Sequence, residues 1–137
     1  MINFAMMNAT IVQSGLKWED KNANLEHLSS LLDEAAPGSG MVVLPEMFTT
    51  GFSMNPSSLA ESMEGPSVSW MLAKAAAGGY ALCGSLIIEE EGNFFNRLLL
   101  VTPEGQVSFY DKRHLHSMSG EQTVYSRGNK RVVVSYR

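Results

Sequence analysis

The chain has 137 residues and a formal net charge of −4 at pH 7, with 45% hydrophobic and 18% charged residues. This length predicts a single domain. The acidic balance argues against a nucleic-acid or anionic-membrane surface, which would need a basic stripe. The single cysteine, Cys83, excludes an intrachain disulfide framework and a cysteine-rich zinc site. The first residues lack the basic region of a signal peptide and no apolar run is long enough to span a bilayer, so we expect a cytoplasmic location.

The first third of the chain predicts a strand, a helix and a second strand. Residues 2–9 form a short apolar run, and residues 19–36 carry leucines at helical spacing. Proline and glycine at 37–40 end this helix. Residues 41–44 form a continuous apolar run, which is typical of a strand buried on both faces. The order predicts a βαβ unit with parallel strands.

The remaining chain predicts a long loop, a helix and further strands. Residues 49–64 are rich in serine, methionine, glycine and proline, and the helix after them begins at Gly65 and ends at Gly78. Strands joined by turns are expected over residues 80–89, 94–102 and 107–110. Residues 111–130 show little periodicity, and residues 131–136 predict a final strand.

This order of elements predicts a layered α/β fold with a mixed sheet. Two helices can cover only one face of a sheet, and a sheet with parallel strands usually has both faces covered. We therefore expect the second face to pack on something outside this sequence.

Three charged residues are candidates to carry chemistry, and two of them lie at the carboxyl ends of strands, where an α/β sheet usually binds its ligands. Glu46 follows the apolar run at 41–44, and Lys112 follows the strand at 107–110. Glu121 lies in the segment without periodicity, where loop residues often carry function. A lysine near a carboxylate can stabilise an oxyanion or donate a proton. Each of these residues taken alone is typical of a solvated surface.

Other reactive residue types give weaker signals. Cys83 lies inside an apolar strand, where a cysteine usually behaves as a small hydrophobic residue. His114 and His116 have no partner at metal-ligand spacing, so no metal site is predicted. The sequence has neither G-x-G-x-x-G nor a P-loop lysine, so it does not support nucleotide binding.

Taken together, three blocks resemble the nitrilase superfamily of carbon–nitrogen hydrolases. They are the run VVLPEMF at 42–48, the run FYDKRHL at 109–115, and Glu121. The resemblance extends over the whole chain, and residues 49–54 look most like the ω-amidase (2-oxoglutaramate amidase) branch.

The resemblance implies half of an α-β-β-α sandwich, with residues 1–137 as the N-terminal part of a single hydrolase domain. It also implies a Glu-Lys-Cys triad in which Glu46 is the general base and Lys112 stabilises the tetrahedral intermediate. Glu121 would orient the lysine and the substrate. A cysteine thiolate would attack the carbon of a small amide, ammonia would leave, and water would hydrolyse the thioester without any cofactor.

The sequence departs from the family pattern at the nucleophile. In this family the catalytic cysteine follows the strand after the lysine block, and the sequence ends at Arg137 before such a cysteine. Cys83 precedes Lys112 and lies in a different strand, so it cannot be assigned that role. We therefore expect the C-terminal half of the sandwich to be absent and this chain alone to be inactive.

The substrate implied by the ω-amidase branch is an ω-monoamide of a short dicarboxylic acid. Phe48 is expected to line an apolar slot beside the scissile bond, together with other apolar residues after Glu46, namely Met47, Phe52 and Met54. Arg113 is a candidate to bind the far carboxylate of such a substrate.

Two other interpretations remain open at this point. The chain could be a non-catalytic module that uses its apolar sheet face to bind a copy of itself or a partner. It could also keep the nitrilase fold but use a different acceptor, as acyltransferases and the glutaminase domains of synthetases do. Family members dimerise through their sandwich layers, and an uncovered sheet face favours self-association, so we expect a homodimer or a higher homo-oligomer.

Overall fold

A computed structural model describes residues 6–136. In chain order the elements are β1 (Ala9–Ile11), α1 (Lys21–Ala35), β2 (Met41–Val43), α2 (Pro56–Leu59), α3 (Pro66–Gly78), β3 (Ala81–Glu90), β4 (Asn93–Val101), β5 (Val107–Asp111), a 3-10 helix (Ser117–Ser119) and α4 (Glu121–Val124). The five strands form one sheet in the order β1-β2-β3-β4-β5. Strands β1, β2 and β3 run parallel, and β4 and β5 continue the sheet antiparallel. The predicted α/β class and mixed sheet are confirmed.

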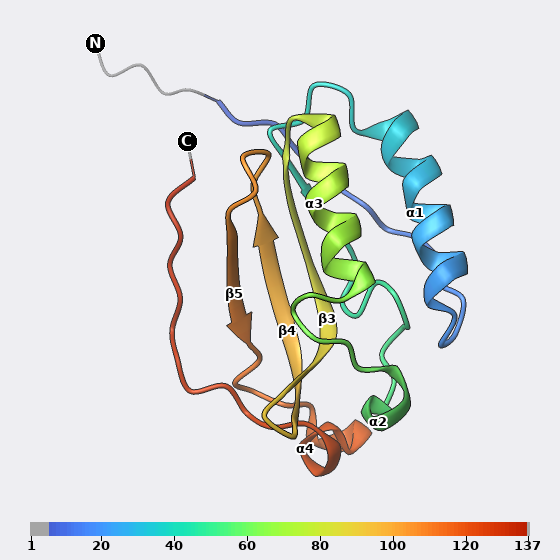
Figure 1. Cartoon of the computed structure of the whole chain (residues 1–137), viewed down its shortest axis with the longest axis vertical. Coiled ribbons are helices and arrows are strands. Elements are labelled where there is room, and N and C mark those ends of the chain that lie inside the picture. Colours follow the sequence, from blue (N-terminus) through green and yellow to red (C-terminus); the bar gives the residue numbers. More distant parts are fainter. Residues whose placement is uncertain (1–5, 137) are drawn as a thin grey trace.

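The two long helices, α1 and α3, lie side by side on one face of the sheet (Figure 1). Leu28 and Leu32 of α1 and Met71 of α3 are buried in one apolar core with Leu82 of β3. The leucine spacing that predicted α1 therefore marks the side of the helix that contacts the sheet. Asp20 caps this helix, because its carboxylate accepts the backbone N–H of Ala23.

Among residues 6–136, no helix packs on the second face of the sheet (Figure 1). Side chains alternate between the two faces along a strand. Leu82 and Leu99 are buried against the helices, so Cys83 and Leu98 lie on the uncovered face. Leu98 is 40% exposed there, and Ile11 on β1 is 77% exposed. Half of a two-sheet sandwich is expected to leave such an apolar face.

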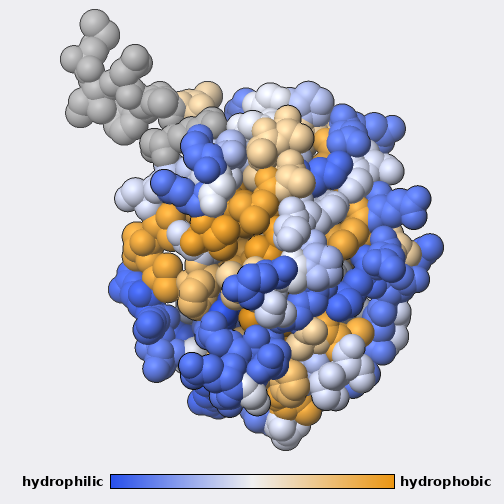
Figure 2. Space-filling model, viewed as in Figure 1, coloured by the Kyte–Doolittle hydropathy of each residue, from blue (hydrophilic) through white to orange (hydrophobic). Residues whose placement is uncertain are grey.

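Apolar residues are also exposed on the helix side of the sheet, beyond the reach of α3. Figure 2 shows apolar side chains gathered near β5 and the C-terminal segment. Val107 and Phe109 of β5 are more than a third exposed there. Val132 and Val134, each 40% exposed, line a cavity with Cys83 and Leu98 on the uncovered face.

The sequence pattern misplaced both ends of the fold. The first strand is Ala9–Ile11 rather than residues 2–9, of which residues 2–5 lie outside the described residues. The predicted strand at 131–136 is wrong, since these residues run beside β5 in Figure 1 but belong to no strand. A run of β-branched apolar residues marks a segment that can pair, but a strand also needs a partner with free backbone groups in register.

The predicted irregular segments contain short helices. The loop expected at 49–64 includes α2, which begins at Pro56, and the segment at 111–130 includes α4. Both helices have four residues, too short for an apolar period to show in the sequence. In the described part of the chain, no helix combines the length and the apolar character needed to cross a membrane.

Candidate active site

The structure brings the three predicted charged residues into one cluster. Lys112 Nζ lies 2.8 Å from Oε1 of Glu46 and 3.0 Å from Oε2 of Glu121. Glu46 follows β2, Lys112 follows β5 and Glu121 opens α4, so three distant parts of the chain meet at one end of the sheet. This arrangement places a cation between two carboxylates.

Asn96 joins the two carboxylates, and the sequence did not single it out as a site residue. Its side-chain amide donates to Oε1 of Glu46 at 2.7 Å and to Oε1 of Glu121 at 3.1 Å. Asn96 lies in β4 and is only 3% exposed. Asparagine is disfavoured inside strands, so its position in the middle of the predicted strand at 94–102 was the signal that could have identified it.

Glu121 is held as an anion inside the protein. Its side chain is fully buried. Burial alone would raise the pKa of this carboxyl group, but hydrogen bonds from the backbone N–H of His116 and the amide of Asn96, together with the Lys112 ammonium, bring the pKa below its ordinary value. The bond from His116 N is 2.6 Å long. With three donors on its two oxygens, Glu121 is suited to hold Lys112 in place.

Lys112 is held as a cation. Burial alone would lower the pKa of its ammonium group, but the hydrogen bonds and charges of Glu46 and Glu121 raise the pKa above its ordinary value. Nζ also lies 5.0 Å from the centre of the Phe52 ring, a distance at which cations are attracted to aromatic faces. A fixed ammonium of this kind can stabilise a developing oxyanion.

Glu46 is the more accessible of the two carboxylates. Its side chain is 50% exposed, whereas that of Glu121 is fully buried. Glu46 therefore has room to accept a proton from an incoming group, which a general base requires.

A cavity of about 230 Å³ lies beside this cluster on the uncovered face of the sheet. It is lined by Leu44, Glu46, Ser85, Asn96, Leu98, Tyr110 and Lys112. Apolar walls around a few convergent polar groups are typical of small-molecule sites.

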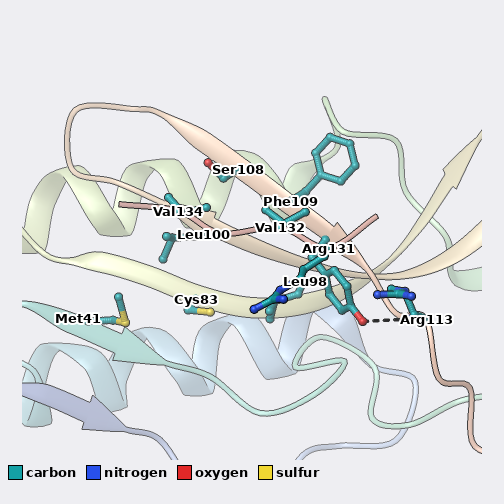
Figure 3. A pocket seen from close by; sticks show the side chains of 11 residues that line it. Met41, Cys83, Leu98, Leu100, Ser108, Phe109, Arg113, Arg131, Val132 and Val134 are labelled. Atoms are coloured by element: carbon teal, nitrogen blue, oxygen red, sulfur yellow. Dashed lines mark hydrogen bonds between the residues drawn. The ribbon is translucent and has the colours of Figure 1, made fainter. Parts of the chain in front are cut away.

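Cys83 lines a different cavity on the same face, of about 560 Å³. Figure 3 shows its thiol among Met41, Leu98 and Arg131. Burial raises the pKa of the Cys83 thiol, whereas a nucleophilic cysteine needs a lowered pKa. The environment of Cys83 therefore agrees with its interpretation as a packing residue.

The two substrate-side candidates are placed differently. Phe48 is fully buried on the helix side of the sheet, with its ring centre 5.7 Å from that of Trp70, so the structure does not bring it to the cluster. Phe52, four residues later, contacts Lys112 instead. Arg113 is exposed and lines the 560 Å³ cavity, where Figure 3 shows it near the uncovered face.

The described residues contain no group of three or more histidine, cysteine, aspartate or glutamate side chains placed to hold a metal ion. The groups gathered in the cluster are two carboxylates, an ammonium and an amide.

The charge of Glu121 is expected to make stability depend on acid pH. Because its pKa is lowered in the folded state, its stabilising contribution is present above the ordinary value of about 4.3 and is lost as pH falls through the folded value. Glu121→Gln should therefore flatten the acid limb of the stability curve. Urea unfolding between pH 3 and 7 measures this, with the exposed Glu26→Gln as control. Parallel curves for wild type and Glu121→Gln would contradict the expectation.

Comparison with known proteins identifies the family. The family model for carbon-nitrogen hydrolase matches residues 8–136, almost the whole sequence. The chain belongs to the carbon–nitrogen hydrolase family. The resemblance to the nitrilase superfamily inferred from the sequence blocks is thereby confirmed.

The relatives of this carbon–nitrogen hydrolase include amidases. Over 133 residues the chain is 44% identical to the ω-amidase YafV of Escherichia coli (strain K12), covering 96% of this chain and 50% of that protein. It is 24% identical over 122 residues to the 2-oxoglutaramate amidase of Bacillus subtilis (strain 168), covering 87% of this chain and 47% of the relative. The chain thus spans about half the length of the curated relatives it matches.

A solved structure also matches this chain over about half of its own length. The protein XC1258 from Xanthomonas campestris, a CN-hydrolase superfamily protein crystallised with an arsenic adduct in its active site, superposes with a TM-score of 0.92 at 39% identity. The match covers 96% of this chain and 49% of that structure. The fold described above therefore corresponds to about half of a nitrilase-superfamily fold.

Proposed function

We propose that this carbon–nitrogen hydrolase contributes to the hydrolysis of a small ω-monoamide of a dicarboxylic acid, with 2-oxoglutaramate as the first candidate substrate. The observation that carries the proposal is the cluster of Glu46, Lys112 and Glu121 beside a cavity. The names of the Escherichia coli and Bacillus subtilis relatives favour this substrate class.

In this proposal the chain supplies the base and the oxyanion-stabilising group, and a cysteine outside this sequence supplies the nucleophile. Glu46 takes the thiol proton, and the thiolate attacks the amide carbon to form a tetrahedral intermediate. The ammonium of Lys112 stabilises the oxyanion. Glu46 returns the proton to the departing nitrogen, which leaves as ammonia. Glu46 then takes a proton from water, and the resulting hydroxide attacks the thioester. Glu46 returns this proton to the departing thiolate, which regenerates the thiol, and the carboxylic acid product ionises in solution.

The remaining half of the sandwich would cover the uncovered face of the sheet. It would bring its cysteine to the 230 Å³ cavity, where Glu46 and Lys112 lie. Until that layer is present, Leu98 and Ile11 remain exposed. Self-association through this same face follows from its apolar character.

A chimera tests the proposed function. Residues 1–137 are fused to the second half of Escherichia coli ω-amidase YafV, since the match covers 50% of that protein. We expect the chimera to release ammonia from 2-oxoglutaramate and the 137-residue chain alone to release none. Glu46→Gln should abolish the turnover of the chimera, and Cys83→Ser should leave it intact.

Two results would contradict the proposal. A folded chimera without turnover of any ω-monoamide would argue against the amidase function. Turnover by the chain alone that Cys83→Ser removes would show that the nucleophile lies within this sequence.

A further inference from the structure

The backbone turns sharply directly after Glu46. Met47 has a φ of 47°, in the left-handed region that residues other than glycine rarely adopt. Its side chain is fully buried, so it cannot relax by moving into solvent. A left-handed conformation is unfavourable for an ordinary L-residue, and the surrounding contacts have to compensate for it.

Ser85 on β3 supplies a contact that holds this turn. Its Oγ accepts the backbone N–H of Met47 at 2.8 Å, and its carbonyl accepts the N–H of Phe48 at 3.2 Å. On the other side of the turn, the carbonyl of Met47 accepts the N–H of Gly51 at 2.8 Å. Met47 is thus bonded through both its N–H and its C=O.

The close approach of β3 to the turn depends on Gly84. A Cβ atom at this position would lie 2.8 Å from Cδ1 of Phe48 and 3.0 Å from Cβ of Leu44. Distances this short require one of the groups to move. The absence of a side chain at residue 84 therefore lets Ser85 reach the turn.

The bond to Ser85 acts on the peptide unit that joins Glu46 to Met47. Fixing the N–H of Met47 fixes the plane of this peptide and with it the direction in which the Glu46 side chain leaves the backbone. Ser85 and Glu46 also line the same 230 Å³ cavity. The half-exposed carboxylate of Glu46 accepts hydrogen bonds from the side chains of Lys112 and Asn96.

We propose that Ser85 is a positioning residue for the carboxylate of Glu46, which it holds against Lys112 by accepting the N–H of Met47. The importance of this position for proton transfer rests on the proposed function. The positioning of Glu46 can be measured without turnover, so an experiment can contradict the role of Ser85 without contradicting the proposed function, and the reverse.

The experiment uses NMR spectroscopy on the 137-residue chain. In Ser85→Ala, we expect the amide exchange of Met47 to accelerate about tenfold, the loss expected for one neutral hydrogen bond. We also expect the pKa of Lys112 to shift downward, because Glu46 contributes to raising it. Ser85→Thr, which keeps the hydroxyl group, should restore both readouts. Ser108→Ala, which removes a serine from the same face of the sheet, should leave both unchanged.

A folded Ser85→Ala variant with unchanged Met47 exchange and Lys112 titration would overturn the proposal, whatever its melting temperature. If Ser85→Ala does not fold, Ser85→Cys keeps the side-chain volume with a weak acceptor. It should show the same two changes at smaller amplitude, and their absence would also overturn the proposal. An inactive chimera with wild-type readouts at Met47 and Lys112 would contradict the proposed function alone.

Discussion

Replacing Arg97 by methionine is expected to lower the free energy of unfolding by about 3–5 kcal/mol, the cost of removing one partner from a buried ion pair. The Arg97 side chain is 1% exposed, and its Nε lies 2.6 Å from Oδ1 of Asp111. A second bond joins Nη2 to Oδ2 of Asp111 at 2.9 Å. The variant would leave Asp111, whose side chain is only 16% exposed, without its cation.

Urea unfolding of wild type and Arg97→Met measures this loss. Glu90→Gln is the matched control, since Glu90 pairs with the same guanidinium at 3.0 Å but has a side chain that is 50% exposed. Exposed pairs contribute at most about 1 kcal/mol. Asp111→Asn combined with Arg97→Met should recover part of the stability, because it removes the unpaired charge. Equal losses in the free energy of unfolding for Arg97→Met and Glu90→Gln would contradict the expectation that the buried Arg97–Asp111 pair matters more than the exposed Arg97–Glu90 pair.

The Arg97–Asp111 ion pair also affects the candidate site, because it helps to fix the register of β4 and β5. Arg97 of β4 lies opposite Asp111 of β5, and these residues adjoin Asn96 and Lys112 in the sequence. The backbone N–H of Lys112 donates to the carbonyl of Asn96 at 3.0 Å. A slip of β5 by one residue relative to β4 would turn Lys112 to the face opposite Asn96. The Arg97–Asp111 pair therefore favours the register that brings Asn96 and Lys112 together.

The parts of the fold that the sequence predicted are those set by local patterns. The spacing of Leu28 and Leu32 predicted α1, and the glycine and proline residues between apolar runs predicted the turns around β3, β4 and β5. The wrong strand at 131–136 has the right local pattern but no pairing partner in the part of the chain that the structure describes. Pairing depends on residues far away in the sequence, which a local pattern does not contain.

The same distinction applies to the candidate site. Glu46 and Lys112 could be predicted because each lies just beyond the carboxyl end of a strand. Asn96 could not be assigned a role, because its function comes from contacts with residues 50 and 25 positions away. Phe48 was expected beside the substrate from its closeness to Glu46 in the sequence, yet the turn at Met47 directs its ring into the core against the helices.

Removal of the Lys112 ammonium is expected to lower the catalytic rate through the loss of oxyanion stabilisation. In the chimera with the second half of the Escherichia coli ω-amidase, Lys112→Met should lower kcat for 2-oxoglutaramate about 10²–10³-fold, as the loss of one oxyanion-stabilising group does in other hydrolases. KM should change much less, because the oxyanion exists only after attack on the amide carbon. Ammonia release at saturating and limiting substrate separates the two parameters.

Two controls distinguish this role from a structural one. Lys74→Met removes a lysine whose partner, Asp33, has a side chain 74% exposed, and it should leave kcat unchanged. Lys112→Met also leaves the buried Glu121 without its cation, so stability is measured alongside, and the double variant with Glu121→Gln should regain stability but not kcat. An increase in KM with an unchanged kcat would mean that Lys112 binds the substrate and the transition state equally, which would contradict its proposed role.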